Sequence, residues 1–176
     1  MQIAWASYLN GELEKGSFYV KTDLESHVEG RNSVVHRAWW TVDEVYVPIC
    51  ISSSHWVACA IHFHRRTITV YDSCPSAHSE QHLVEVMQPM SELLPYLLDD
   101  AGFYNIRTDL KFSKEAFTVV RPTDGIPLQQ ISGDCGVFTC MYIYYLGLNR
   151  PLDFSFLDGP FFRMRMAVEL WTGHLL

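Results

Sequence analysis

Residues 43–73 read DEVYVPICISSSHWVACAIHFHRRTITVYDS, and the hydrophobic pattern of this stretch predicts three consecutive β-strands. An alternating, β-branched run at 42–49 predicts the first strand, an apolar run at 56–63 the second, and a β-branched run at 67–72 the third. Only a short basic turn separates the last two runs, so we expect these two strands to form a hairpin.

Helical patterns follow the strand block. Apolar residues at spacings of three and four predict a long helix over 79–102, in which Pro89 and Pro95 indicate breaks or new starts. Residues 136–147 predict a second long helix with an apolar face, and residues 161–176 predict a closing helix.

Shorter elements complete the pattern. Residues 17–24 have a helical tendency, residues 31–40 predict a short helix, and residues 117–120 predict a short strand. This order of elements indicates an α+β fold, and we expect residues 1–176 to form one domain with no internal boundary.

The composition excludes several classes of protein. A formal net charge of −7 argues against a broad basic face for nucleic acid. The five cysteines are odd in number and form no CxxC pair, so the sequence indicates neither a disulfide framework nor a zinc site, and a reducing compartment is expected. No run of 18 apolar residues predicts a membrane span, and the N-terminus does not have the pattern of a secretory signal. We expect no metal or other cofactor.

Cys135 is the strongest candidate nucleophile because it lies where the second long helix is predicted to begin. Unpaired backbone N–H groups and the helix dipole stabilise a thiolate at such a position. Asp134 is a candidate N-cap, and glycines on both sides of this pair would let a substrate backbone approach closely. Cys59 and Cys140, which lie inside a predicted strand and a predicted helix, are expected to be packed thiols.

A nucleophilic thiol needs a base, and the base needs a group that fixes its tautomer. His55 precedes the second strand and Asp72 ends the third, seventeen residues later, so a hairpin can bring both to one sheet edge. Each residue taken alone also fits an ordinary role: a surface or core histidine, a turn or cap aspartate, a structural cysteine. Only their joint occurrence points to catalysis, because histidines are abundant here, including His62, His64, His78 and His82.

Residues 43–73, together with IPLQQISGDCGVF at 126–138, resemble the Ulp/SENP family of SUMO-specific cysteine proteases. This papain-like group has the chain order His, Asp, Gln, Cys. The shared features are a His-Trp pair, a strand ending in Asp-Ser at the same spacing, and an Asp-Cys-Gly motif preceded by Gln. The resemblance implies a papain-like α+β fold with a central, mostly antiparallel sheet flanked by helices, and a nucleophile at a helix N-terminus.

The resemblance also implies a role for each matching residue. Cys135 would be the nucleophile, His55 its base and Asp72 the group that orients the imidazole. Gln129 would help form the oxyanion hole, because it lies six residues before the cysteine as in the family. Gln130 would fit only with one residue deleted before the cysteine. Trp56 would line the tunnel that admits the Gly-Gly tail of the substrate.

The N-terminal part departs from the family pattern. An upstream Trp-Leu-Asn-Asp type motif, whose tryptophan clamps the substrate, is not found, since Trp5, Trp39 and Trp40 lie in a different context. Residues 1–176 are therefore expected to be a single Ulp-type domain that lacks part of the usual N-terminal segment.

The resemblance implies a monomeric peptidase or isopeptidase that cleaves after the Gly-Gly tail of a ubiquitin-like modifier such as SUMO, in the nucleus or cytoplasm. Nucleic acid and membranes are not expected partners. Two alternatives stay open. The chain could bind a modifier without cleaving it, or it could be a thiol enzyme of the same fold that acts on another modifier or on an acyl donor.

Overall fold

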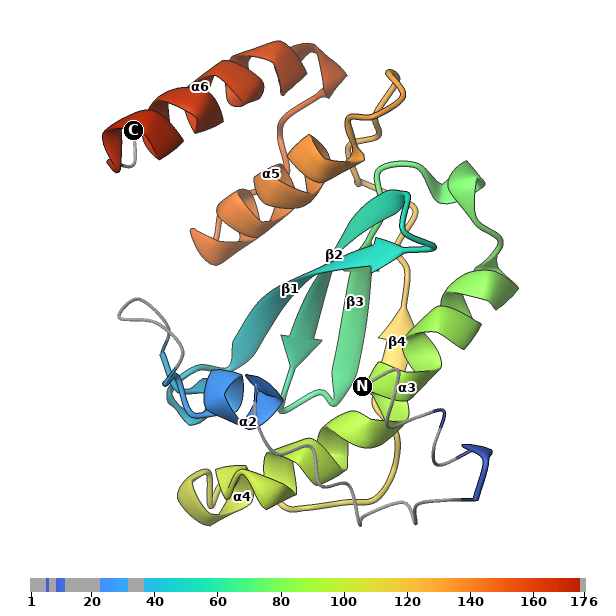
Figure 1. The fold of residues 1–176 in the computed structure, drawn as a ribbon, viewed down its shortest axis with the longest axis vertical. Helices are drawn as coiled ribbons and strands as arrows, with labels where there is room; N and C mark the ends of the chain where they lie inside the picture. The colour runs from blue at the N-terminus through green and yellow to red at the C-terminus, as the bar shows by residue number, and fades with distance from the viewer. Residues whose placement is uncertain (1–5, 7–8, 12–22, 32–36, 175–176) are drawn as a thin grey trace. The chain divides into compact units, whose positions relative to one another are not determined.

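The computed structural model describes residues 6, 9–11, 23–31 and 37–174 (Figure 1). Part of each N-terminal helix prediction lies outside the described residues, namely 17–22 and 32–36. In the adjoining described parts, helix α2 spans Asp23–Val28 and a 3₁₀ turn, η1, spans Trp39–Thr41.

The chain divides into two compact units, which are described separately. The first comprises Met1–Val45, Ile61–Ile68 and Glu80–Val120. The second comprises Tyr46–Ala60, Thr69–Ser79 and Arg121–Leu176. The expectation of a single domain stays a prediction.

The strand block forms as predicted, with small shifts at its ends. Strand β1 spans Glu44–Ile51, β2 spans His55–His62, β3 spans Thr67–Tyr71 and the short β4 spans Thr118–Val120. They form one sheet in the order β1-β2-β3-β4. Since short turns join β1 to β2 and β2 to β3, both pairs are antiparallel hairpins. Sheet and helices together confirm the predicted α+β class.

The turn between β1 and β2 fixes where the second strand begins. Ser52 and Ser53 have φ of 51° and 57°, and the Ser54 N–H donates to the Ile51 carbonyl at 3.1 Å. Two central residues with positive φ twist a hairpin in the same sense as its strands. This tight turn makes His55 the first residue of β2.

In the first unit, helix α3 (Glu80–Asp100) is continuous, so the expected breaks at Pro89 and Pro95 are wrong. Pro95 cannot donate to the carbonyl of Ser91, four residues earlier. That carbonyl instead accepts the backbone N–H of Phe117 at 2.9 Å, and the Ser91 hydroxyl donates to the Phe117 carbonyl at 2.5 Å. Both prolines are also buried, so tertiary packing offsets their helix cost.

Three smaller features complete the first unit. Helix α4 spans Phe103–Ile106 and was not predicted from the sequence. The Arg107 guanidinium that follows it donates to the Val42 carbonyl at 2.8 Å and to Asp43 at 3.0 Å. No helix in the described ranges has the length and hydrophobicity needed to cross a membrane.

In the second unit, helix α5 (Cys135–Gly147) lies beside helix α6 (Gly159–Thr172), as Figure 1 shows. Side chains of α5 also pack against Ala58 of strand β2. Both helices confirm the predicted elements. The closing helix is shorter than predicted, because it ends at Thr172 with Gly173 in the left-handed region, and residues 175–176 lie outside the described residues. A cluster of buried side chains joins the strand to both helices, and it comprises Ala58, Val137, Phe138, Met141, Tyr142, Phe154 and Phe162. Burying these rings and aliphatic groups holds the start of α5 in a fixed place relative to β2.

Candidate active site

His55 and Asp72 meet at one edge of the sheet, as the hairpin predicts. The start of β2 lies beside the end of β3, and His55 Nε2 is 2.7 Å from Asp72 Oδ1. Both residues are buried, with exposed fractions of 6% and 1%. Because an ionised carboxylate only accepts hydrogen bonds, Nε2 carries the proton, and Nδ1 is the ring nitrogen left to accept one.

Two further donors hold the Asp72 carboxylate. The Cys74 N–H donates to Oδ1 at 2.9 Å, and Arg121 Nη1 donates to Oδ2 at 3.3 Å. The same guanidinium donates to the carbonyls of Pro75 and His78 at 3.4 and 3.3 Å. A cation beside the buried carboxylate compensates its negative charge.

Arg121→Ala is expected to lower the free energy of unfolding by about 3 kcal/mol, because it leaves the buried Asp72 carboxylate without its cation. Urea denaturation followed by circular dichroism measures the change. The control is Arg150→Ala, which alters an exposed arginine and should change stability by no more than about 0.5 kcal/mol. Equal losses in the two variants would show that the ion pair at Asp72 contributes nothing.

Cys135 is the first residue of α5, as predicted, and its exposed fraction is 8%. Asp134 occupies the N-cap position, but its side chain makes no capping hydrogen bond, so the expected cap is wrong. The carboxylate pairs instead with Arg163 of α6. The N–H groups of the first turn of α5 are therefore not used by this side chain.

The two glutamines before the cysteine differ in their surroundings. Gln129 is tied to the residue after Asp72: the Ser73 hydroxyl donates to its Oε1 at 2.7 Å, and its backbone N–H donates to the Ser73 carbonyl at 2.9 Å. Its side-chain NH₂ donates to the Ile131 carbonyl at 3.2 Å. Gln130 is exposed. Of the two amides, only that of Gln129 has a position set by the neighbouring strand end.

Trp56 lies next to the first turn of α5. Its exposed fraction is 42%, and the Cβ that any other residue would carry at position 136 lies 3.9 Å from Trp56 Cδ1. The residue that follows His55 thus adjoins the residue that follows Cys135. The structure places all five predicted site residues in the second unit.

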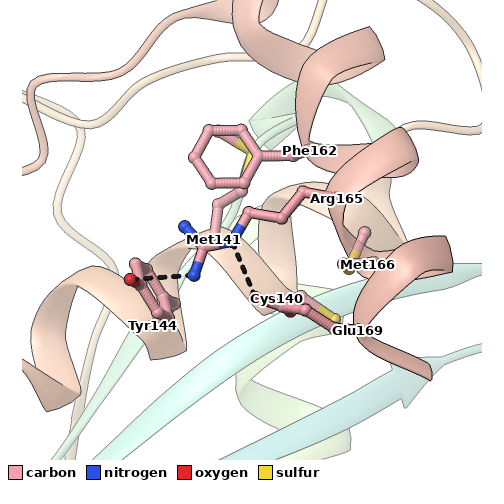
Figure 2. A pocket seen from close by; sticks show the side chains of 7 residues that line it. All are labelled: Cys140, Met141, Tyr144, Phe162, Arg165, Met166 and Glu169. Atoms are coloured by element: carbon pink, nitrogen blue, oxygen red, sulfur yellow. Dashed lines mark hydrogen bonds and ion pairs between the residues drawn. The ribbon is translucent and has the colours of Figure 1, made fainter. Parts of the chain in front are cut away.

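The other two cysteines singled out in the sequence differ from each other. Cys59 is fully buried, and burial raises the pKa of its thiol to about 12, which makes it a packed thiol as expected. Cys140 is exposed, so the expectation that it is packed is wrong. It faces a cavity of about 180 Å³ between α5 and α6 (Figure 2). Arg165 lies in this cavity between its two hydrogen-bond partners, Tyr144 and Glu169.

Sequence reasoning missed four residues that support the site. Ser73 holds Gln129, Arg121 holds Asp72, and Arg163 holds Asp134. Tyr142 of α5 donates to the Pro127 carbonyl in the loop before Gln129, and burial together with the Asp72 charge raises the pKa of its hydroxyl. Of these four residues, only Ser73 belongs to a motif that is visible in the sequence, namely the Asp-Ser pair at the end of the third strand.

Within the described residues, no group of three or more His, Cys, Asp or Glu side chains is arranged to hold a metal ion. The polar groups at the site are instead a hydrogen-bonded imidazole and carboxylate, a thiol at a helix N-terminus and a fixed amide. These are the kinds of side chain that nucleophilic catalysis by a thiol uses.

Comparisons with known sequences find one protease family. The family model described as "Ulp1 protease family, C-terminal catalytic domain" matches residues 5–172. The human protein "Sentrin-specific protease 2" is 28% identical over 122 residues, which are 69% of this chain and 19% of that protein. "Ubiquitin-like-specific protease 1" of Saccharomyces cerevisiae is 28% identical over 137 residues, covering 76% of this chain and 19% of that protein. The chain thus spans about a fifth of the length of these relatives.

Solved structures show the same fold. The yeast C-terminal Ulp1 protease domain, solved in complex with Smt3, superposes with a TM-score of 0.57 at 23% identity, over 74% of this chain and 53% of that one. The Ulp1-like SUMO protease catalytic domain of Chaetomium thermophilum matches with a TM-score of 0.52 at 28% identity, over 77% of this chain and 48% of that one.

Proposed function

The chain belongs to the Ulp1 protease family, and on this premise we propose that it is a cysteine peptidase that cleaves after the Gly-Gly tail of a SUMO-class modifier. One observation carries the proposal: the buried hydrogen bond between His55 and Asp72, on the unit whose next long helix begins at Cys135. A buried imidazole with a fixed tautomer is the feature that a thiol nucleophile needs and that a modifier-binding surface does not.

The proposed reaction begins with proton transfer. His55 Nδ1 takes the proton of the Cys135 thiol, and Asp72 stabilises the resulting imidazolium through Nε2. The thiolate attacks the carbonyl carbon of the terminal glycine. The C–N bond of the tetrahedral intermediate then breaks, and the leaving amine takes the proton from His55. Water, deprotonated by His55, hydrolyses the thioester and restores the thiol.

Gln129 and Trp56 have proposed roles beside this reaction. The Gln129 NH₂ carries two N–H donors, and one of them is directed at the Ile131 carbonyl. We assign the other to the oxyanion, together with backbone N–H groups at the start of α5. The half-exposed Trp56 indole would cover the Gly-Gly tail, since two residues without side chains fit beside a flat ring.

The proposed partners are a SUMO-class modifier and its conjugates, handled by a monomer in the nucleus or cytoplasm. Two findings support the choice of modifier: a related structure was solved with Smt3, and relatives are named as sentrin-specific proteases. A reducing compartment suits a thiolate nucleophile, because oxidation would inactivate it.

The test is reaction of the purified chain with SUMO, ubiquitin and other ubiquitin-like modifiers that carry a C-terminal vinyl sulfone. A covalent SUMO adduct is expected, and peptide mass spectrometry should locate it on Cys135. An adduct with another modifier alone would contradict the SUMO assignment. SUMO binding without any adduct, in a chain shown to be folded, would favour a modifier-binding module.

A further inference from the structure

Helix α6 reaches the loop that carries the candidate nucleophile. Arg163 Nη2 donates to the Gly133 carbonyl at 3.2 Å and pairs with Asp134 Oδ1. The Asp134 side chain is buried, with an exposed fraction of 8%, and its Oδ2 lies 3.8 Å from the position that a Cβ would take at Gly159, the first residue of α6. One guanidinium therefore holds both residues that precede Cys135.

The pairing decides what Asp134 does. An aspartate at an N-cap normally accepts a hydrogen bond from the N–H of the second or third helical residue. Here the backbone of Asp134 is in the right-handed helical region, with φ of −86° and ψ of −5°, and the side chain makes no such bond. Because Arg163 binds the carboxylate, Asp134 neither occupies the first N–H groups of α5 nor leaves its negative charge unpaired beside Cys135.

We propose that Arg163 is a positioning residue of the candidate active site, which holds Asp134 away from the N-terminus of α5 and compensates its charge beside the nucleophile. This inference rests on the proposed function, because it assigns the N–H groups of the first turn to the thiolate and the oxyanion. It gives α6, which contributes no group to the chemistry, a direct effect on the reactivity of Cys135.

Arg163→Ala tests the proposal. Without the guanidinium, the Asp134 carboxylate can cap the first turn of α5, and its charge opposes formation of the Cys135 thiolate. The rate of Cys135 alkylation by iodoacetamide, plotted against pH, should shift to higher pH by about 0.5 to 1 unit, which is the size expected for one uncompensated charge near a surface. The kcat for release of the modifier tail should fall about tenfold, while KM changes little.

Two further variants separate electrostatics from folding. The double variant Asp134→Asn/Arg163→Ala removes the uncompensated charge, so its alkylation curve should return to the wild-type position. Arg163→Lys keeps the cation and should stay close to wild type. The other titratable groups of the site are His55, Asp72, His78 and Arg121. They are the same in every variant, so a difference between two alkylation curves is caused by the change at Asp134 or Arg163.

Arg165→Ala is the matched control. Arg165 lies two residues along the same helix, but its guanidinium donates to Tyr144 and Glu169 in the cavity of Figure 2, and it stacks on the Tyr144 ring at 4.5 Å. Its removal should leave the alkylation curve and kcat unchanged.

The alkylation experiment tests the role of Arg163 separately from the proposed function, because iodoacetamide reacts with Cys135 without any modifier. An unshifted curve in a folded Arg163→Ala protein would overturn the positioning role. So would an equal shift in the double variant, which would indicate a structural effect alone. If Arg163→Ala does not fold, the alkylation curves of Arg163→Gln and Arg163→Lys are compared instead. Only the glutamine variant lacks the positive charge, so only its curve should shift to higher pH. A shifted curve in a chain that reacts with no modifier probe would support the positioning role and refute the proposed function.

Discussion

Replacing Cys135 by alanine should lower cleavage of a SUMO precursor by about 10⁴-fold or more, because it removes the proposed nucleophile that forms the acyl-enzyme. Binding of the modifier should persist, since the thiol is buried at the helix start and contributes little contact area. Cleavage is measured by gel densitometry under single-turnover conditions, and binding by calorimetry with the mature modifier.

Two other cysteines provide controls for this variant. Cys140 lies on the same helix and is exposed, so Cys140→Ala should retain full turnover. Cys59 is excluded as the nucleophile without a substitution. Burial raises the pKa of its thiol to about 12, which keeps it in the unreactive thiol form at neutral pH. Substantial cleavage by Cys135→Ala, or its loss in Cys140→Ala, would place the nucleophile elsewhere.

Asp72→Asn is expected to reduce kcat by roughly 10³- to 10⁴-fold, as removal of the orienting carboxylate does in comparable triads. The carboxylate oxygens accept from three donors: His55 and the Cys74 N–H on Oδ1, and Arg121 on Oδ2. An amide has only one acceptor atom. Its NH₂ must therefore face either Arg121 or the pair formed by His55 and Cys74, and at least one donor loses its acceptor.

Stability measurements separate the two roles of Asp72. Asp72→Asn should also lower the free energy of unfolding, by about 3 kcal/mol, since it removes the carboxylate that pairs with the Arg121 guanidinium. Asp72→Asn/Arg121→Met removes both charges, and it should regain part of the stability but none of the lost kcat. A double variant that recovered kcat would show that Asp72 serves folding alone.

Much of the site could be predicted from the sequence because its parts are local. His55 and Asp72 lie at matching ends of two strands joined by a four-residue turn, so alternating apolar residues and a tight turn are enough to bring them together. Cys135 was placed at a helix start by glycines followed by an apolar helical run. Gln129 is favoured over Gln130 by its distance along the chain from the cysteine, and its role stays a prediction.

The wrong expectations concern residues whose partners are distant in the sequence. Pro95 indicated a break because the helix loses a hydrogen bond there, but the freed Ser91 carbonyl is satisfied by Phe117, twenty-six residues later. Asp134 indicated a cap because short-range propensity favours one, but Arg163, twenty-nine residues later, binds its carboxylate. Cys140 is expected to be packed because it lies inside a predicted helix, and only the packing of α6 shows which side of that helix faces the cavity.

The sequence by itself determined the strand block, the start of α5 and the three candidate side chains His55, Asp72 and Cys135, since hydrophobic periodicity and turn residues act within a few positions of each other. The tertiary structure alone decided which charges compensate Asp72 and Asp134. Arg121 and Arg163 have no sequence signal, because an ion pair depends on the distance between two side chains in space, and the packing of α5 and α6 sets that distance for Asp134.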